Sequence, residues 1–446
     1  MDGALTKSAS ALGREIGEGR IDPVALTEAY LAAIAAHPVA ERIYARLTPE
    51  RALSEARAAR QRQREGARLG PLDGVPISWK DLFDSAGTAT EGGSALLKGR
   101  VPETDAKVLA AASAMGLVCL GKTHMSELAF SGLGLNPVTA TTPCINDPEA
   151  VSGGSSSGAA GSVAFGLAAA AIGSDTGGSV RIPAAWNDLV GLKTTSTRLS
   201  LDGAIPLAPR FDTVGPLCRS VEDAAQLLAA LEGRAADDDA VPPLAGRRFA
   251  MLETVATDGL RETPARAYGD ALARLSAAGA LLEPLSFPPL HEAMSFSGIL
   301  YGVEAYGHWK DRIEAEPDLM FPPIRERFRS GAEFLGADYI AAWVRLEEIR
   351  AQWAAATERF DAVLCPTNAI MPPKTERLLI DEDYYVTENL LTLRNTRIGN
   401  LLGLAVLTLP TATPSVGLSL MGRPFGEEAI LSLGRAAEAA LGADQA

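Results

Sequence analysis

Apolar and polar residues recur along this chain with the periods that mark helices and strands. The clearest helical pattern covers residues 23–36, where Leu26, Tyr30 and Ile34 fall on one face. Asp22 stands directly before this stretch and a proline follows it, which is typical of a helix start. The pattern therefore predicts a capped helix at this position.

Further helices and strands alternate along the rest of the chain. Helices are expected at residues 49–65, 104–115, 220–231 and 264–279. Short apolar runs predict strands at residues 75–79, 116–121, 248–252, 280–283, 360–365 and 406–409. Strands that alternate with helices are typical of an α/β domain whose sheet strands are buried.

We find no internal repeat and no linker that would divide the chain. The densest polar break, residues 235–240, is interpreted as a surface loop rather than a domain boundary. The prediction is therefore a single domain over residues 1–446.

Charge and hydropathy exclude several classes of partner. The net charge of −14 at pH 7 argues against binding to nucleic acid or to an anionic membrane surface. The longest apolar run, residues 162–172, is too short for a membrane span, which takes roughly 20 residues. This run is predicted to be a buried helix that passes into a buried strand. Residues 1–20 lack an apolar signal core, so we expect a cytoplasmic protein.

The cysteines and histidines show no metal-binding pattern. The four cysteines are far apart and have no Cys-x-x-Cys spacing, so each is expected to be a small core residue. The histidines show no His-x-x-x-His or His-x-Glu spacing. We therefore expect neither a metal nor a cofactor.

Three short segments carry the candidate chemistry. They are residues 74–81 (GVPISWKD), 152–158 (SGGSSSG) and 173–183 (GSDTGGSVRIP). Together they supply a lysine, a serine in a Gly/Ser-rich loop and a serine after two glycines. This is a residue set for nucleophilic acyl transfer without a histidine.

In these segments and their order the chain resembles the amidase signature family, enzymes that hydrolyse C–N bonds through a Ser–cis-Ser–Lys triad. The resemblance covers residues 71–221 most densely, resumes at 360–367 (FDAVLCPT), and closes with 400–404 (NLLGL) and 417–422 (GLSLMG). It implies an α/β fold with a central mixed β-sheet covered by helices on both faces. Residues 290–345 would form a variable substrate-pocket region, and residues 360–446 would complete the same domain.

The resemblance places the triad at Lys80, Ser155 and Ser179. It implies that Ser179 is the nucleophile, that Ser155 passes on its proton, and that Lys80 is the general base. A free lysine has a pKa near 10.4, so Lys80 can serve as a base at neutral pH only if burial favours its neutral form. Lys80 follows the largely apolar residues 75–79, which makes a buried position plausible.

The glycines before Ser179 indicate an oxyanion hole. A turn of this kind lets backbone N–H groups converge where a side chain would block them. The candidate donors are the N–H groups of Thr176, Gly177, Gly178 and Ser179.

Three more residues are expected to support this turn. Asp175 and Arg181 flank it and are predicted to form a salt bridge, and Ser156 is a secondary hydrogen-bonding candidate. Ser156 is also the centre of a Gly-x-Ser-x-Gly string at residues 154–158, the pattern of Ser-His-Asp hydrolases. A single match in a Gly/Ser-rich loop is weak evidence, and the lysine segment explains the whole set better.

Substrate specificity is expected to come from the aromatic-rich residues 290–345. Tyr301 and Trp309 are its candidate pocket residues, and Met125 and Leu135 are candidates from outside it. Such an apolar pocket would favour uncharged aryl amides over small charged ones. The alternative, that these aromatic residues are core faces of helices, stays open at this point.

Two functions compete. The first is a stand-alone hydrolase of amides, with aryl esters and carbamates (urethanes) as further substrates, acting as a monomer or homodimer. The second is the glutaminase subunit of a tRNA-dependent amidotransferase. Such subunits carry an acidic residue before the Asn-Leu-x-Gly motif, whereas residues 389–400 contain none and Leu393 lies near that position. The α-ammonium of glutamine would lack a partner there, which favours the stand-alone hydrolase.

Overall fold

The computed structural model describes residues 3–236 and 241–442. Most of the predicted loop at residues 235–240 lies outside these ranges. The helices are α1 (Ala9–Gly17), α2 (Pro23–Ala36), α3 (Pro49–Glu65), α4 (Lys107–Ala114), α5 (Ser157–Ala164), α6 (Arg181–Trp186), α7 (Val221–Leu231), α8 (Glu262–Ala277), α9 (Pro289–Ser295), α10 (Ser297–Ala315), α11 (Pro322–Arg329), α12 (Gly336–Thr357), α13 (Thr375–Ile380), α14 (Glu382–Leu401) and α15 (Glu427–Leu441). The strands are β1 (Tyr44–Leu47), β2 (Pro76–Lys80), β3 (Val118–Thr123), β4 (Pro143–Cys144), β5 (Asp147–Val151), β6 (Ala170–Asp175), β7 (Val190–Lys193), β8 (Thr213–Cys218), β9 (Arg248–Leu252), β10 (Leu281–Leu285), β11 (Ala362–Pro366), β12 (Val406–Pro410) and β13 (Gly417–Met421).

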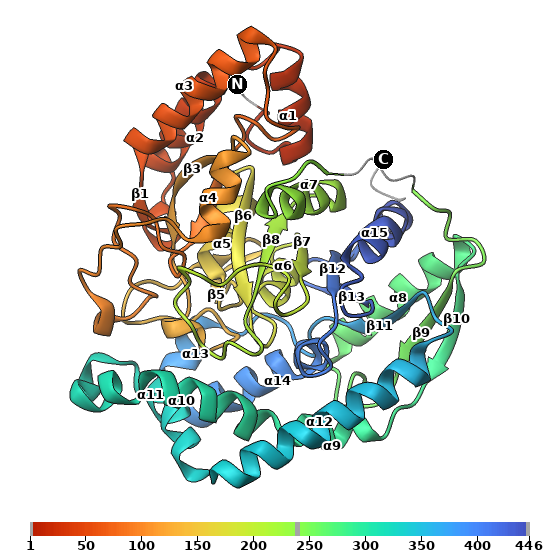
Figure 1. Cartoon of the computed structure of the whole chain (residues 1–446). Helices are drawn as coiled ribbons and strands as arrows, with labels where there is room; N and C mark the ends of the chain where they lie inside the picture. Colours follow the sequence, from red (N-terminus) through yellow and green to blue (C-terminus); the bar gives the residue numbers. More distant parts are fainter. Residues whose placement is uncertain (1–2, 237–240, 443–446) are drawn as a thin grey trace.

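One mixed sheet runs through the molecule (Figure 1). Its eleven strands follow the order β1-β3-β2-β6-β8-β7-β12-β13-β11-β9-β10, and β4 and β5 form a separate two-stranded ribbon. β2 pairs in parallel with both β3 and β6, whereas β6, β8, β7, β12 and β13 pair antiparallel in succession. Strands from both ends of the sequence therefore share one sheet.

Helices cover both faces of this sheet, as the resemblance implies. Ala171 and Leu217 pack in one apolar cluster with Val163 of α5, whereas Ile172 belongs to the main core together with Leu227 of α7. Successive side chains of a strand point to opposite faces. It follows that α5 lies on one face and α7 on the other.

The predicted elements are largely present. The Asp22 side chain accepts hydrogen bonds from the N–H groups of Val24 and Ala25 and so caps α2, as expected. The apolar run at residues 162–172 does pass from a buried helix, α5, into a buried strand, β6. No helix within the described ranges has the length and apolar character of a membrane span.

The helices of the variable region lie together on the side of the molecule away from α1–α3 (Figure 1). Here α10 packs against both α11 and α12, and α14 runs nearby. Several aromatic residues of this region are core residues, among them Trp309 and Phe328. The alternative interpretation of this segment, core faces of helices, therefore holds for these side chains.

Candidate active site

Lys80 lies at the carboxyl end of β2, inside the sheet. The parallel register between β2 and β6 places Trp79 opposite Ile172, so the carboxyl ends of both strands meet at one edge. In α/β sheets this is the usual edge for a ligand site. The buried Lys80 Nζ lies 2.7 Å from Ser155 Oγ and 2.8 Å from Ser174 Oγ of β6.

Burial changes the acid–base behaviour of Lys80. Desolvation disfavours the ammonium form and lowers the pKa of Lys80 to about 7, even though the nearby Asp175 and Asp212 raise it. A substantial fraction of the amine is then neutral at physiological pH. Lys80 thus meets the requirement for a base at neutral pH, a buried position that favours the neutral form.

Ser155 is held in a closely packed loop between β5 and α5. The Gly154–Ser155 peptide bond is cis. A Cβ added to Gly154 would lie 2.6 Å from both Gly134 N and Ser126 Oγ, so only glycine fits at that position. The Ser155 carbonyl accepts a hydrogen bond from Ser126 N–H at 3.1 Å.

Ser156 connects this loop to the segment that carries Ser179. Its N–H donates to the Ser179 carbonyl at 3.1 Å. Its Oγ accepts from Ser174 N–H at 3.4 Å and lies 3.3 Å from the Ser174 carbonyl. The loop, β6 and the turn at Ser179 are thereby held as one unit.

The carboxylate of Asp175 organises the turn at Ser179. It accepts hydrogen bonds from the N–H groups of Gly178 at 2.9 Å and Val180 at 3.1 Å. It also forms the predicted salt bridge with Arg181, at 2.9 Å. Burial alone would raise the pKa of Asp175, but the Arg181 guanidinium holds it well below its usual range. Asp175 is therefore an anion whose hydrogen bonds hold the turn at Ser179 in place.

This geometry corrects one part of the expected oxyanion hole. Because the Gly178 N–H points to Asp175, it is not available to a substrate in this structure. The N–H groups of Thr176, Gly177 and Ser179 are not donated to any acceptor within residues 3–236 and 241–442. The candidate donors are reduced to these three.

Helix α14, from the C-terminal part of the chain, makes hydrogen bonds to the same turn. Thr396 Oγ1 donates to the Gly177 carbonyl at 2.7 Å, and Asn400 Nδ2 donates to Asp175 Oδ1 at 2.9 Å. The Arg181 guanidinium donates to the Thr396 carbonyl at 2.7 Å. Asn400 belongs to one of the segments that carry the family resemblance, but nothing in the sequence pointed to Thr396.

Two further residues at the site were missed from the sequence. Ser174 lies in one of the three motifs but was given no role, although its Oγ contacts Lys80. Asp212 is buried and lies 2.5 Å from Thr176 Oγ1, in a stretch without any recognisable motif. Burial raises the pKa of Asp212. Only the three-dimensional structure identifies it as a neighbour of the turn.

Ser179 lines a small cavity of about 20 Å³. The walls include Phe130, Tyr301, Leu393 and two arginines, Arg327 and Arg397, which lie on α11 and α14. A cavity of this size holds about one or two water molecules. It is narrower and more cationic than the apolar aryl pocket expected from the sequence.

Of the four predicted pocket residues, only Tyr301 lines this cavity. Met125 and Leu135 are instead fully buried in the main core. Trp309 packs in the core, and its indole N–H donates to the Pro206 carbonyl at 2.9 Å. Sequence position alone could not separate aromatic residues that face the cavity from those that fill the core.

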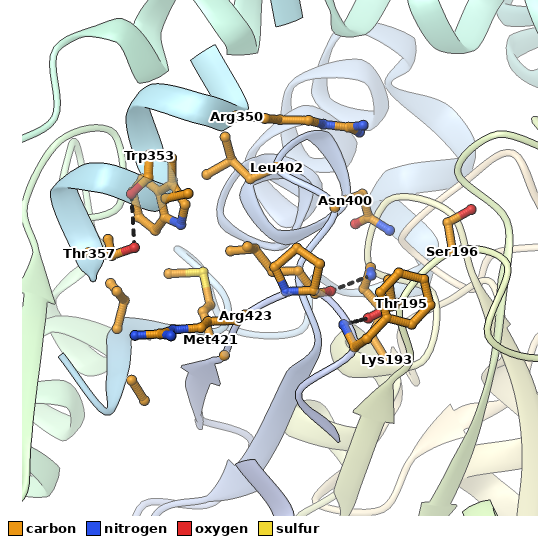
Figure 2. Close-up of a pocket in the computed structure, with 18 of the residues that line it drawn as sticks. Lys193, Thr195, Ser196, Arg350, Trp353, Thr357, Asn400, Leu402, Met421 and Arg423 are labelled. Atoms are coloured by element: carbon orange, nitrogen blue, oxygen red, sulfur yellow. Dashed lines mark hydrogen bonds between the residues drawn. The ribbon is translucent and has the colours of Figure 1, made fainter. Parts of the chain in front are cut away.

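The structure also has a larger cavity, of about 920 Å³, whose lining residues are drawn in Figure 2. Lys193, Arg350 and Trp353 are among its lining residues, and Asn400 forms part of its wall. Asn400 also donates to Asp175, so it connects the wall of this cavity to the buried ion pair. No member of the candidate triad lines it, so the chemistry belongs to the smaller cavity.

The described residues offer no donor set for a metal. All four cysteines are buried and unpaired, and no three His, Cys, Asp or Glu side chains of residues 3–236 and 241–442 gather closely enough to hold an ion.

Known proteins share this architecture. Residues 25–431 match the Amidase family. The chain is 32% identical to a glutamyl-tRNA(Gln) amidotransferase subunit from Chloroflexus aurantiacus over 94% of each chain. It is 33% identical to the 2-amino-5-chloromuconic acid deaminase of Comamonas testosteroni, over 88% of this chain and 87% of that protein. A crystal structure of an amidase superposes with a TM-score of 0.88 at 31% identity, covering 98% of this chain and all of that one. The chain thus belongs to the amidase family and is an enzyme that hydrolyses carbon–nitrogen bonds.

Proposed function

We propose that this enzyme hydrolyses amides through a covalent acyl-enzyme on Ser179, with Ser155 and Lys80 as a proton relay. The observation that carries the proposal is the buried Lys80 amine, which lies 2.7 Å from Ser155 Oγ and has a pKa lowered to about 7 by burial. A neutral amine has a lone pair that can accept the serine proton. Activation of a serine by an adjacent base is the general requirement for such a nucleophile.

The proposed reaction proceeds in two halves. Ser179 Oγ attacks the substrate carbonyl carbon, and its proton moves to Ser155 Oγ while the Ser155 proton moves to Lys80 Nζ. The N–H groups of Thr176, Gly177 and Ser179 stabilise the tetrahedral oxyanion. The relay then runs backwards and protonates the leaving nitrogen, so the C–N bond breaks and the acyl group stays on Ser179. Water releases the acyl group by the same steps.

This mechanism also extends to aryl esters and carbamates. Both present the carbonyl oxygen that the oxyanion hole would bind, and a carbamate differs from an amide only by an alkoxy oxygen on the acyl side. The relay protonates a departing nitrogen or oxygen in the same way. We therefore propose amides as the principal substrates and the other two classes as further ones.

The proposal is tested by covalent labelling. A neutral fluorophosphonate should label the purified protein at Ser179, located by mass spectrometry of the digested chain, and Ser179→Ala should lose both labelling and turnover. Circular dichroism of the variant should match the wild type. Labelling at Ser156 instead, or undiminished labelling of the Ser179→Ala protein, would contradict the assignment of the nucleophile.

The second candidate function is a glutaminase subunit of a tRNA-dependent amidotransferase. It is favoured by the similarity to proteins named as subunits of glutamyl-tRNA(Gln) amidotransferase. Against it stands Leu393, which lies near the position of the acidic residue that such subunits carry and lines the cavity at Ser179. We propose the stand-alone hydrolase, a monomer or homodimer that acts on a small molecule without a nucleic-acid partner. A requirement for a second protein, shown by activity that appears only in its presence, would reverse this choice.

A further inference from the structure

We propose that the larger cavity, of about 920 Å³, is a second ligand site that binds one uncharged aromatic small molecule. Its volume lies in the range of roughly 300–1,000 Å³ that is usual for small-molecule sites, whereas the cavity at Ser179 has about 20 Å³. None of the described residues that line the larger cavity also lines the smaller one. The inference is therefore independent of the reaction proposed above.

Aromatic side chains form much of the wall of the larger cavity. They come from segments that are far apart in the sequence, and they are Phe211, Trp343, Trp353, Phe360 and Phe425. The rings of Phe211 and Trp343 stack on one another, with centroids 5.0 Å apart and planes 19° apart. Part of the aromatic wall is thus ordered before any ligand binds, which lowers the entropic cost of binding. Aromatic walls favour a ligand that itself carries an aromatic ring, because the two can stack or meet edge to face.

Phe425 is the most unusual of these aromatic residues. It lines the cavity and is still 60% exposed. Its φ of 58° lies in the left-handed region, which is uncommon for residues other than glycine and recurs at ligand clamps. The Phe425 N–H donates to Thr195 Oγ1 at 2.7 Å, so the loop after β13 is held in this conformation. An apolar ring is thereby fixed at the edge of the cavity, where a bound ligand can cover it.

The charged residues of the wall favour an uncharged ligand. Three arginines and three carboxylate side chains line the cavity, and they are Arg210, Arg350, Arg423, Glu347, Glu358 and Asp361. Arg350 pairs with Glu347 at 2.8 Å, and Asp361 pairs with Arg247 at 3.2 Å. A charged ligand would have to compete with these pairs, and a buried charge without a partner is costly. The balance of charges therefore selects neither an anion nor a cation.

Polar and apolar groups lie on different sides of the cavity. Figure 2 shows Lys193 and Thr195 on the right and Trp353 and Met421 on the left. Lys193 Nζ donates to two backbone carbonyls, at 2.9 and 2.7 Å, and burial lowers its pKa to about 7, so the amine is only partly charged at neutral pH. The ligand that fits has an aromatic body toward Trp353 and a neutral hydrogen-bonding group toward Thr195.

The inference is tested on the full-length wild-type protein with two fluorescent probes. N-phenyl-1-naphthylamine is uncharged, and 8-anilinonaphthalene-1-sulfonate is the same ring system with an added sulfonate. In fluorescence titrations we expect the neutral probe to bind one site per chain. Its dissociation constant should be at least about 10-fold lower than that of the sulfonate, because the sulfonate would bury a charge. Equal or tighter binding of the sulfonate overturns the ligand class, and the absence of saturable binding of the neutral probe overturns the site.

Substitutions then assign the binding to this cavity. Ala354 of α12 is exposed and lines the cavity, so Ala354→Trp should fill part of it and weaken binding of the neutral probe at least about 10-fold. Ala356 of the same helix is exposed but is not among the lining residues, so Ala356→Trp is the matched control and should keep the wild-type dissociation constant. Phe425→Ala removes the exposed ring and should weaken binding about 2- to 10-fold. Wild-type binding by Ala354→Trp refutes the assignment; if that variant does not fold, Phe425→Ala decides in the same way.

Covalent labelling distinguishes the two cavities. Protein that a neutral fluorophosphonate has labelled at Ser179 should bind N-phenyl-1-naphthylamine with an unchanged dissociation constant, because the two cavities share no lining residue among those described. Loss of probe binding after labelling would place the probe at Ser179 and overturn the second site. A protein that is not labelled at Ser179 refutes the proposed mechanism instead, and the probe titrations with the variants still decide on the ligand site.

Discussion

The lowered pKa of Lys80 predicts an unusual pH dependence for acylation. A lysine with its ordinary pKa of 10.5 would be neutral in only about one molecule in 3,000 at pH 7, whereas a pKa of about 7 leaves about half of the molecules neutral. Only the neutral amine can accept a proton. Burial therefore raises the active fraction by roughly three orders of magnitude at neutral pH.

Because the protonated form is inactive and dominates below the pKa, acylation should slow as the pH falls. Between pH 8 and pH 6 the neutral fraction drops from about nine-tenths to about one-tenth, so the rate should fall about tenfold. Above pH 8 the rate should hardly change.

The assay is the rate of Ser179 labelling by a neutral fluorophosphonate between pH 5.5 and 9.5. Such a probe does not titrate, so the midpoint reports the enzyme. A rate that keeps rising tenfold per pH unit through pH 9, as expected for an ordinary lysine, would refute the reasoning. Lys193, a second buried lysine whose pKa burial lowers to about 7, provides the control. It donates to backbone carbonyls away from the triad, so Lys193→Met should keep the midpoint.

Three further outcomes are expected. Lys80→Ala and Ser155→Ala should each slow acylation by several orders of magnitude. The loss of rate in the double variant should be smaller than the product of the two single losses, because relay partners act as a unit. Strictly multiplicative losses in stopped-flow labelling would argue against a relay. Arg181→Met leaves the buried Asp175 without its ion-pair partner and should cost about 3–5 kcal/mol of unfolding free energy in urea titrations. Arg345→Met, which removes a surface ion pair with Glu292, should cost much less. Amide turnover should survive chelators, since the site uses serine and lysine; loss of activity that zinc or magnesium restores would contradict the mechanism.

The sequence was most informative where local chemistry decides the structure. The Asp22 cap set the start of α2, and the Ser220 side chain caps α7 by accepting from Asp223 N–H, at the start of the helix expected over residues 220–231. Strand β8 was not predicted although it lies near the middle of the sheet. Its Pro216 pairs with Ile172, and a proline without an N–H argues against a central strand from sequence alone.

The residues of the candidate site differ in the same way, because some stand in local sequence motifs and others do not. Lys80, Ser155 and Ser179 stand in recognisable segments, and the Asp175–Arg181 pair follows from their flanks. Arg327 and Arg397 could not be recognised in this way. Each is a polar residue on a helix that also has solvent-facing charges, and spacing along a helix does not reveal which polar side chain ends in a cavity. Their position in the wall of the cavity depends on how distant helices pack, which no local pattern encodes.

The hydrogen bonds from α14 to the turn at Ser179 have a consequence for the synthesis of the chain. Lys80, Ser155 and Ser179 are all made early, but Thr396 and Asn400 follow roughly 220 residues later. At typical rates of translation this delay is roughly 10–40 s. During that time the nascent chain carries the proposed nucleophile and base without the helix that holds the turn. Hydrolytic activity should therefore appear only when the chain is nearly complete, so that an unfinished or truncated copy cannot hydrolyse amides indiscriminately in the cell.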